Sequence, residues 1–251
     1  RSELAQDAVL AWMAEWAHPA RASLDHDLHE LGRAFLAFLH EQHDRPVPEH
    51  DHVEVSTQAK RMDVVVNLKR KGEVVSALLI EDKVYAGEHG DQLARYKKAM
   101  EKTVAPELLL PIYLTTWFIR RIKDRTGYKI LDLEHMAGFL GQERWNSLDN
   151  SIFKDFREHI VGRWQRAEAF KTAPMEQWTF SQWIGLFNSL KKVLPDDYKV
   201  EFDRVDNPQR KSVACWGGFT PISKEDGPRI YFQIHVSKTK SQDGSRYRQE
   251  L

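Results

Sequence analysis

Cysteine is almost absent from this 251-residue chain, in which Cys215 is the single copy. One thiol excludes a framework of intrachain disulfides, and it is typical of proteins that fold in a reducing compartment. We therefore expect a cytoplasmic protein in which Cys215 is a small core residue.

The sequence also lacks long apolar runs and any excess charge of one sign. The longest apolar stretch, residues 108–119, is shorter than the roughly 20 residues that cross a bilayer, so we predict no membrane contact. Lysine and arginine together number 37, as do aspartate and glutamate. This balance does not predict general adhesion to nucleic acid, so any such contact must be local. At 41% hydrophobic residues, the chain can still bury a sizeable core.

What the sequence does contain is a hairpin pattern between residues 61 and 96. A β-branched run begins at Asp63, and a second apolar run, residues 74–84, ends in three charged residues. The polar turn between them includes Gly72, which can adopt the positive φ of a short hairpin turn. We therefore predict two adjacent antiparallel strands.

Strand alternation predicts which charged groups of this hairpin converge. Glu81 and Lys83 should point to one face and Asp82 to the other, and antiparallel pairing brings Asp63 to the same end as Glu81. Hard carboxylate oxygens suit Mg²⁺, and a neighbouring ammonium can position or activate a water and neutralise a phosphate. The alternative interpretation is a solvated strand end.

These residues resemble the motif of the PD-(D/E)XK nuclease superfamily, an aspartate followed after a gap by an acid-x-lysine triplet. Here the positions are Asp63 and Glu81-Asp82-Lys83, with Met62 in place of the proline. Gln92 and Tyr96, four residues apart on a predicted helix, resemble the Q-x-x-x-Y element of recombination-repair nucleases.

The amino-terminal opening S-E-L-x-Q-D-A also resembles one branch of that superfamily, in which an acid of the first helix reaches the metal. Asp7 is the candidate and Glu3 the alternative. Asp7 could instead interact only with the helix dipole.

The resemblance implies a metal-dependent nuclease that hydrolyses phosphodiester bonds, with DNA favoured over RNA and a setting in defence or repair. It implies Mg²⁺, for which Mn²⁺ can substitute, and it leaves a homo-oligomer or a partner protein open. The expected site residues are catalytic Asp63, Glu81, Lys83, Gln92 and Tyr96; metal-binding Asp63, Glu81 and Asp7; and nucleic-acid-binding Arg61, Lys97 and Lys98. The alternatives are an inactive nucleic-acid or protein-binding module on the same fold and a scaffold without enzymatic activity.

The order of predicted elements is that of an α/β, restriction-endonuclease-like αβββαβ core with a mixed sheet. Amphipathic helices are expected at 3–17 and 24–43, a strand at 52–58 before the hairpin, a helix at 90–102 and a buried strand at 106–116. The core should occupy residues 1–145. Residues 146–251 should form an accessory region of two helices and a small antiparallel sheet.

The sequence also predicts the burial or exposure of particular residues and the structure of a few short segments. The first helix should bury the stripe of Leu4, Ala8, Ala11, Trp12 and Trp16. The six histidines between residues 26 and 52 should be exposed rather than bind zinc, because their spacing does not match a zinc-protease helix. Residues 128–133 should form a short strand, and the basic run 118–125 is either a phosphate contact or a solvated face. Residues 237–251, which have few apolar side chains, are expected to be either flexible or cut short.

Overall fold

The computed structural model describes residues 2–59, 62–83, 91–116, 127–193, 200–202, 213–221, 229–241 and 244–250. Arg61 and the basic run 118–125 lie outside these ranges. The chain divides into two compact units, residues 1–161 and 162–251, and each is described by itself.

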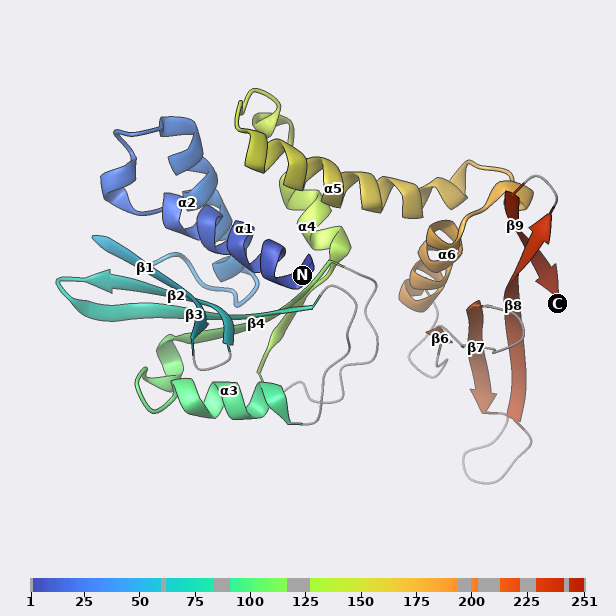
Figure 1. The fold of residues 1–251 in the computed structure, drawn as a ribbon. Helices are drawn as coiled ribbons and strands as arrows, with labels where there is room; N and C mark the ends of the chain where they lie inside the picture. The colour runs from blue at the N-terminus through green and yellow to red at the C-terminus, as the bar shows by residue number, and fades with distance from the viewer. Residues whose placement is uncertain are drawn as a thin grey trace. The chain divides into compact units, whose positions relative to one another are not determined.

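A five-stranded mixed sheet organises the first unit (Figure 1). Its strands are β1 (His52–Ala59), β2 (Met62–Arg70), β3 (Glu73–Lys83), β4 (Leu109–Thr115) and β5 (Lys129–Leu131), in that spatial order. The first three are antiparallel, whereas β4 pairs parallel with both β3 and β5. The predicted hairpin is confirmed. Its turn is Lys71-Gly72, with φ of 52° and 87°, a pair of left-handed residues that suits a two-residue hairpin loop.

Helix α3 (Gln92–Met100) makes the crossover from β3 to β4 on one face of the sheet (Figure 1). Leu93 and Met100 pack there against Val65 and Leu79, and all four side chains are buried. A 3-10 turn (Pro106–Leu108) then leads into β4, whose seven residues are all buried. Burial on both faces explains why β4 reads as a continuous apolar run.

Helices α1 (Ser2–Trp16) and α2 (His26–Glu41) cover the other face, joined through a 3-10 turn (Pro19–Arg21) (Figure 1). The predicted α1 stripe is right only for Ala11, which is buried, because Ala8 is exposed and Trp12 and Trp16 are half-buried. The Leu4 side chain lies outside the described residues. The buried side instead carries Leu10 and Met13 together with two polar residues, Gln6 and Asp7. Hydrophobicity alone missed this face because those polar side chains find hydrogen-bond partners at the sheet.

Histidines of α2 are also more buried than predicted. His40 is 1% exposed, with Nδ1 2.8 Å from the Leu36 carbonyl and Nε2 3.0 Å from Ser76 Oγ on β3. His29 is buried too, and its Nδ1 lies 2.8 Å from the Trp16 carbonyl. These histidines fasten α2 to the sheet and to α1, which corrects the expectation that all six are exposed.

The remaining helices of the first unit were only partly predicted. Residues 128–133 yield a strand only as far as Leu131, because the Asp132 side chain caps α4 (Leu133–Leu140) and ends the extended run. Phe139 of α4 stacks on Phe38 of α2, with ring centroids 4.9 Å apart. A 3-10 turn (Glu143–Trp145) precedes α5 (Ser151–Glu168), which begins in the first unit and ends in the second.

The second unit contains α6 (Phe180–Val193) and a four-stranded antiparallel sheet in the order β6-β7-β8-β9. Its strands are β6 (Val200–Phe202), β7 (Val213–Pro221), β8 (Arg229–Ser241) and β9 (Gly244–Glu250). Short 3-10 turns occupy Ala169–Lys171 and Met175–Gln177. The predicted small sheet is present. Within the terminal segment, residues 237–241 belong to β8 and pair with β9.

Aromatic rings form the packing of α6. The ring centroids of Trp178 and Trp183 are 4.9 Å apart, and Trp183 and Phe187 are buried. Trp183 and Phe187 are therefore core residues, whereas Trp178 is half-buried. Cys215 lies on β7, but its side chain is outside the described part of the chain.

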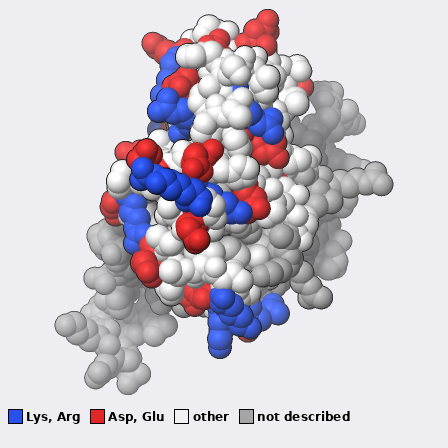
Figure 2. Space-filling view, turned by 90° about the vertical axis from the view of Figure 1, so that its left-hand side faces the viewer, with Lys and Arg blue, Asp and Glu red and all other residues white. Residues whose placement is uncertain are grey.

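Charges of both signs are interspersed on the face shown in Figure 2. Within the described residues, no helix is long and apolar enough to span a bilayer.

Candidate functional site

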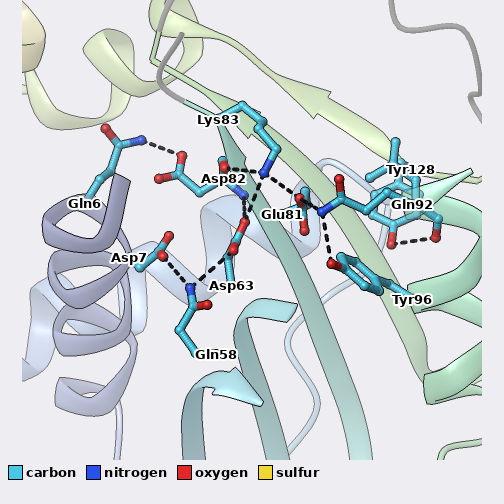
Figure 3. Close-up of polar contacts among 11 residues, drawn as sticks. Gln6, Asp7, Gln58, Asp63, Glu81, Asp82, Lys83, Gln92, Tyr96 and Tyr128 are labelled. Atoms are coloured by element: carbon cyan, nitrogen blue, oxygen red, sulfur yellow. Dashed lines mark hydrogen bonds and ion pairs between the residues drawn. The ribbon is translucent and has the colours of Figure 1, made fainter. Parts of the chain in front are cut away.

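The ends of β2 and β3 bring the motif residues together. Val64 pairs with Ile80, so continuing the antiparallel register places Asp63 opposite Glu81. Lys83 Nζ lies 2.6 Å from Glu81 Oε1 and 3.6 Å from Asp63 Oδ2 (Figure 3). The backbone N–H of Asp82 donates to Asp63 Oδ2 at 2.9 Å, which fixes the aspartate against the neighbouring strand. The result is an ammonium group held beside two carboxylates.

Helix α3 supplies the second side of this site. Gln92 Nε2 lies 2.7 Å from Glu81 Oε1, to which it donates, and 3.0 Å from the Tyr96 hydroxyl (Figure 3). Gln92 and Tyr96 are one helical turn apart, so both side chains reach the end of β3. Glu81 Oε1 therefore accepts from both Lys83 and Gln92. Glu81 Oε2 is buried and has no hydrogen-bond partner among the described residues.

Burial dominates the electrostatics of Glu81. The residue is 1% exposed, and desolvation raises its pKa to about 7 although Lys83 acts in the opposite direction. Loss of water disfavours the charged carboxylate more than the single ammonium compensates. A further cation at this position would restore the ionised form.

Asp7 of α1 approaches Asp63 from the other face of the sheet. Gln58 Nε2, on β1, donates to Asp7 Oδ2 at 2.9 Å and to Asp63 Oδ1 at 3.3 Å (Figure 3). Burial, and then the charge of Asp63, raise the pKa of Asp7 to about 6. Asp7 Oδ1 is buried without a hydrogen-bond partner in the described part of the chain.

Asp82 points away from Lys83, as strand alternation predicts. Its Oδ1 accepts from Gln6 Nε2 at 2.5 Å, and Gln6 Oε1 accepts from Thr116 Oγ1 at 2.8 Å. Burial, and then the charges of Asp7 and Asp63, raise the pKa of Asp82 well above its usual range. This network ties α1 to the ends of β3 and β4.

Two residues that contact the site, Gln6 and Gln58, were not identified from the sequence. Gln6 had a signal, because it precedes Asp7 in the S-E-L-x-Q-D-A opening. Gln58 had none, since its position depends on an unusual backbone conformation, with φ of 53° inside a strand.

Two of the three expected nucleic-acid-binding residues lie on α3, just after Tyr96. Lys97 is on α3, with Nζ 4.0 Å from Glu101, and Lys98 is exposed on the same helix. Arg61 and the side chain of Glu3 lie outside the described residues.

Comparison with known protein families shows which family this chain belongs to. The sequence profile of the PD-(D/E)XK nuclease superfamily matches residues 39–173, more than half of the chain. The chain belongs to this superfamily. The matched range includes the hairpin, α3 and β4, whereas Asp7 precedes it. Neither the curated proteins nor the solved structures contain a significant match.

The donor set of this superfamily member fits a hard divalent cation. Asp63, Glu81 and Asp7 offer only carboxylate oxygens, and two of these oxygens are buried without a hydrogen-bond partner among the described residues. In the same part of the chain, no three His, Cys, Asp or Glu residues are already arranged as a metal-holding group. Instead, Lys83 Nζ lies beside the carboxylates of both Glu81 and Asp63.

Proposed function

We propose that this protein is a Mg²⁺-dependent nuclease that hydrolyses phosphodiester bonds, with DNA as its substrate class. The observation that carries the proposal is the Lys83 ammonium between Glu81 and Asp63 at the end of β3. A solvated strand end would not bury Glu81 to 1% exposure or hold it with two donors. The preference for DNA follows from family resemblance alone.

Asp63 and Glu81, joined by Asp7, would hold the cation, and Mn²⁺ could replace Mg²⁺. The bound cation would polarise the phosphate and stabilise the negative charge that develops in the transition state. The carboxylates are already anchored by the protein: Asp63 by the Asp82 N–H and Glu81 by Gln92. This anchoring restricts the orientations that the two carboxylates can adopt.

Lys83 would orient the attacking water through its ammonium group, which lies beside both carboxylates, or would deprotonate that water from its neutral amine form. Gln92 fixes the orientation of the Glu81 carboxylate, and it also holds the Tyr96 hydroxyl beside the site. Tyr96 is thereby available to steady a phosphate oxygen. Lys97, Lys98 and Arg61 would contact backbone phosphates further along the strand.

The experiment compares wild type with Asp63→Asn and Lys83→Ala, using linear DNA, circular DNA and RNA with Mg²⁺, Mn²⁺ or chelator. Asp63→Asn should abolish cleavage yet leave DNA affinity equal or higher, because one negative charge near the phosphates is removed. Lys83→Ala should abolish cleavage with a modest loss of affinity. Asp27→Asn, an exposed change in the first turn of α2, is the control and should cut normally.

A wild-type protein that binds DNA but cuts none of these substrates with either metal would contradict the proposal. In that case the inactive binding module on the same fold becomes the better description.

A further inference from the structure

Gln58 adopts a backbone conformation that its position in a strand does not predict. Its φ is 53°, in the left-handed region that L-residues other than glycine, asparagine and aspartate seldom occupy. Asp44 and Lys71 share this feature, but Asp44 follows the end of α2 and Lys71 is in the hairpin turn. Gln58 lies within β1, between the paired residues Thr57 and Ala59. Such an outlier calls for a function.

Regular strand geometry would direct the Gln58 side chain toward Asp63 but away from Asp7. The β1–β2 register puts Gln58 opposite Asp63, and directly opposed residues of an antiparallel pair share a face. That face carries Val65 and Leu79, which pack against α3. Asp7, by contrast, comes from α1 on the opposite face (Figure 1).

The left-handed turn allows one amide to reach both faces. Gln58 Nε2 is 2.9 Å from Asp7 Oδ2 and 3.3 Å from Asp63 Oδ1, and Figure 3 shows it between the two carboxylates. Two carboxylates brought this close repel each other. A shared N–H donor counters that repulsion and fixes the orientation of both groups.

We propose that Gln58 is a positioning residue, whose side-chain amide ties Asp7 of α1 to Asp63 of β2 and so presets this carboxylate pair for a divalent cation. The inference rests on the proposed function. It assigns a role to a residue outside the family motif, and it explains why the strand tolerates an unfavourable backbone conformation at this point.

Two substitutions separate the side chain from the backbone. Gln58→Met keeps the length and the backbone strain but removes the donor. Gln58→Gly removes the donor and also accepts a positive φ without strain. If the amide positions the ligands, both variants should bind Mn²⁺ about tenfold more weakly, the scale seen when a hydrogen bond to a metal ligand is lost. The free energy of unfolding of the glycine variant should equal or exceed that of the methionine variant.

The measurement is a titration of the full chain with Mn²⁺, followed by the electron paramagnetic resonance signal of free Mn²⁺ and without nucleic acid. Denaturant unfolding of each variant in chelator provides the stability readout. Lys71→Gly is the matched control, because it relieves a similar φ of 52° in the hairpin turn. It should leave Mn²⁺ affinity unchanged.

The outcomes distinguish the inference from the function on which it rests. Wild-type Mn²⁺ affinity in both Gln58 variants, with an active wild-type enzyme, would overturn the positioning role alone. The positioning role would also be overturned if only the methionine variant bound Mn²⁺ weakly and the glycine variant bound it normally. Affinity would then depend on the stability of the fold and not on the amide donor. A wild-type protein that binds no Mn²⁺ would overturn the proposed function itself.

Discussion

Glu81 is nearly inaccessible to solvent, yet it accepts two hydrogen-bonding donors on one oxygen and none on the other among the described residues. Its charge is therefore incompletely compensated by Lys83 and Gln92. Asp7 also has one buried oxygen without a hydrogen-bond partner among the described residues. As for Glu81, burial is the main reason that its pKa is raised. At the scale of single residues, the site resembles a cation site more than a finished ion-pair network.

Replacing Glu81 by glutamine should stabilise the metal-free protein above neutral pH. The folded pKa is about 7 against 4.5 for the unfolded chain, so the folded state binds more protons between these values. Wild-type stability should consequently fall as pH rises through this window. Glu81→Gln should lose the part of that dependence that Glu81 contributes, while Asp7 and Asp82 keep theirs. The variant should gain up to about 3 kcal/mol at pH 8, at 1.36 kcal/mol per pKa unit.

Urea unfolding in chelator from pH 4 to pH 8 provides the measurement. Parallel wild-type and Glu81→Gln stability profiles across that range would contradict the assignment of the raised pKa to Glu81. Cleavage should be lost in this variant, although folding improves.

At the scale of elements, Gly32 of α2 determines how closely α1 and α2 approach. A Cβ atom at Gly32 would lie 2.6 Å from the Trp16 carbonyl carbon and 2.8 Å from the Met13 carbonyl oxygen, and it would also contact Ala17 N. These are backbone atoms, which cannot yield as a side chain can. The close contact matters for the site because α1 carries Gln6 and Asp7.

Gly32→Ala should therefore destabilise the protein by about 1–3 kcal/mol, the usual cost of overpacking. Gly138→Ala is the control, since Gly138 is also helical and no atom lies within 4 Å of its added Cβ. That change should stabilise by about 0.5–1 kcal/mol through helix propensity. Denaturant midpoints of the two variants should move in opposite directions, and equal shifts would contradict the packing argument.

At the scale of the whole molecule, the chain carries no formal net charge, with 37 basic and 37 acidic residues. Affinity for nucleic acid must therefore come from a few local contacts. The chain divides into compact units 1–161 and 162–251, and all the site residues belong to the first unit. The second unit, with α6 and its antiparallel sheet, has no assigned role.

If Lys98 contacts a phosphate, Lys98→Gln should weaken binding to duplex DNA whatever its sequence. The slope of log affinity against log salt concentration should fall by about 0.9, the value for one phosphate contact. Fluorescence anisotropy in chelator at several salt concentrations measures this slope. Lys154→Gln, which removes an exposed lysine from α5, is the control and should leave the slope unchanged. An unaltered slope in Lys98→Gln would remove Lys98 from the interface.

The sequence by itself determined the sheet and the motif that it carries. Strand alternation and the position of Gly72 were enough to predict the β2–β3 hairpin and the common face of Glu81 and Lys83, because these depend on local geometry. The α3 pairing of Gln92 with Tyr96 is equally local, since it follows from helical spacing. The range whose match shows membership of the superfamily, residues 39–173, includes these same residues.

Tertiary structure alone decided the surroundings of that motif. The phase of α1 depended on hydrogen-bond partners far along the chain, so no hydrophobic pattern could show that Gln6 and Asp7 are buried. The burial of His40 likewise depended on its contact with Ser76 of another element. Gln58 is the clearest case: a left-handed residue in a strand is unfavourable locally, and only contacts with α1 and β2 together can stabilise it.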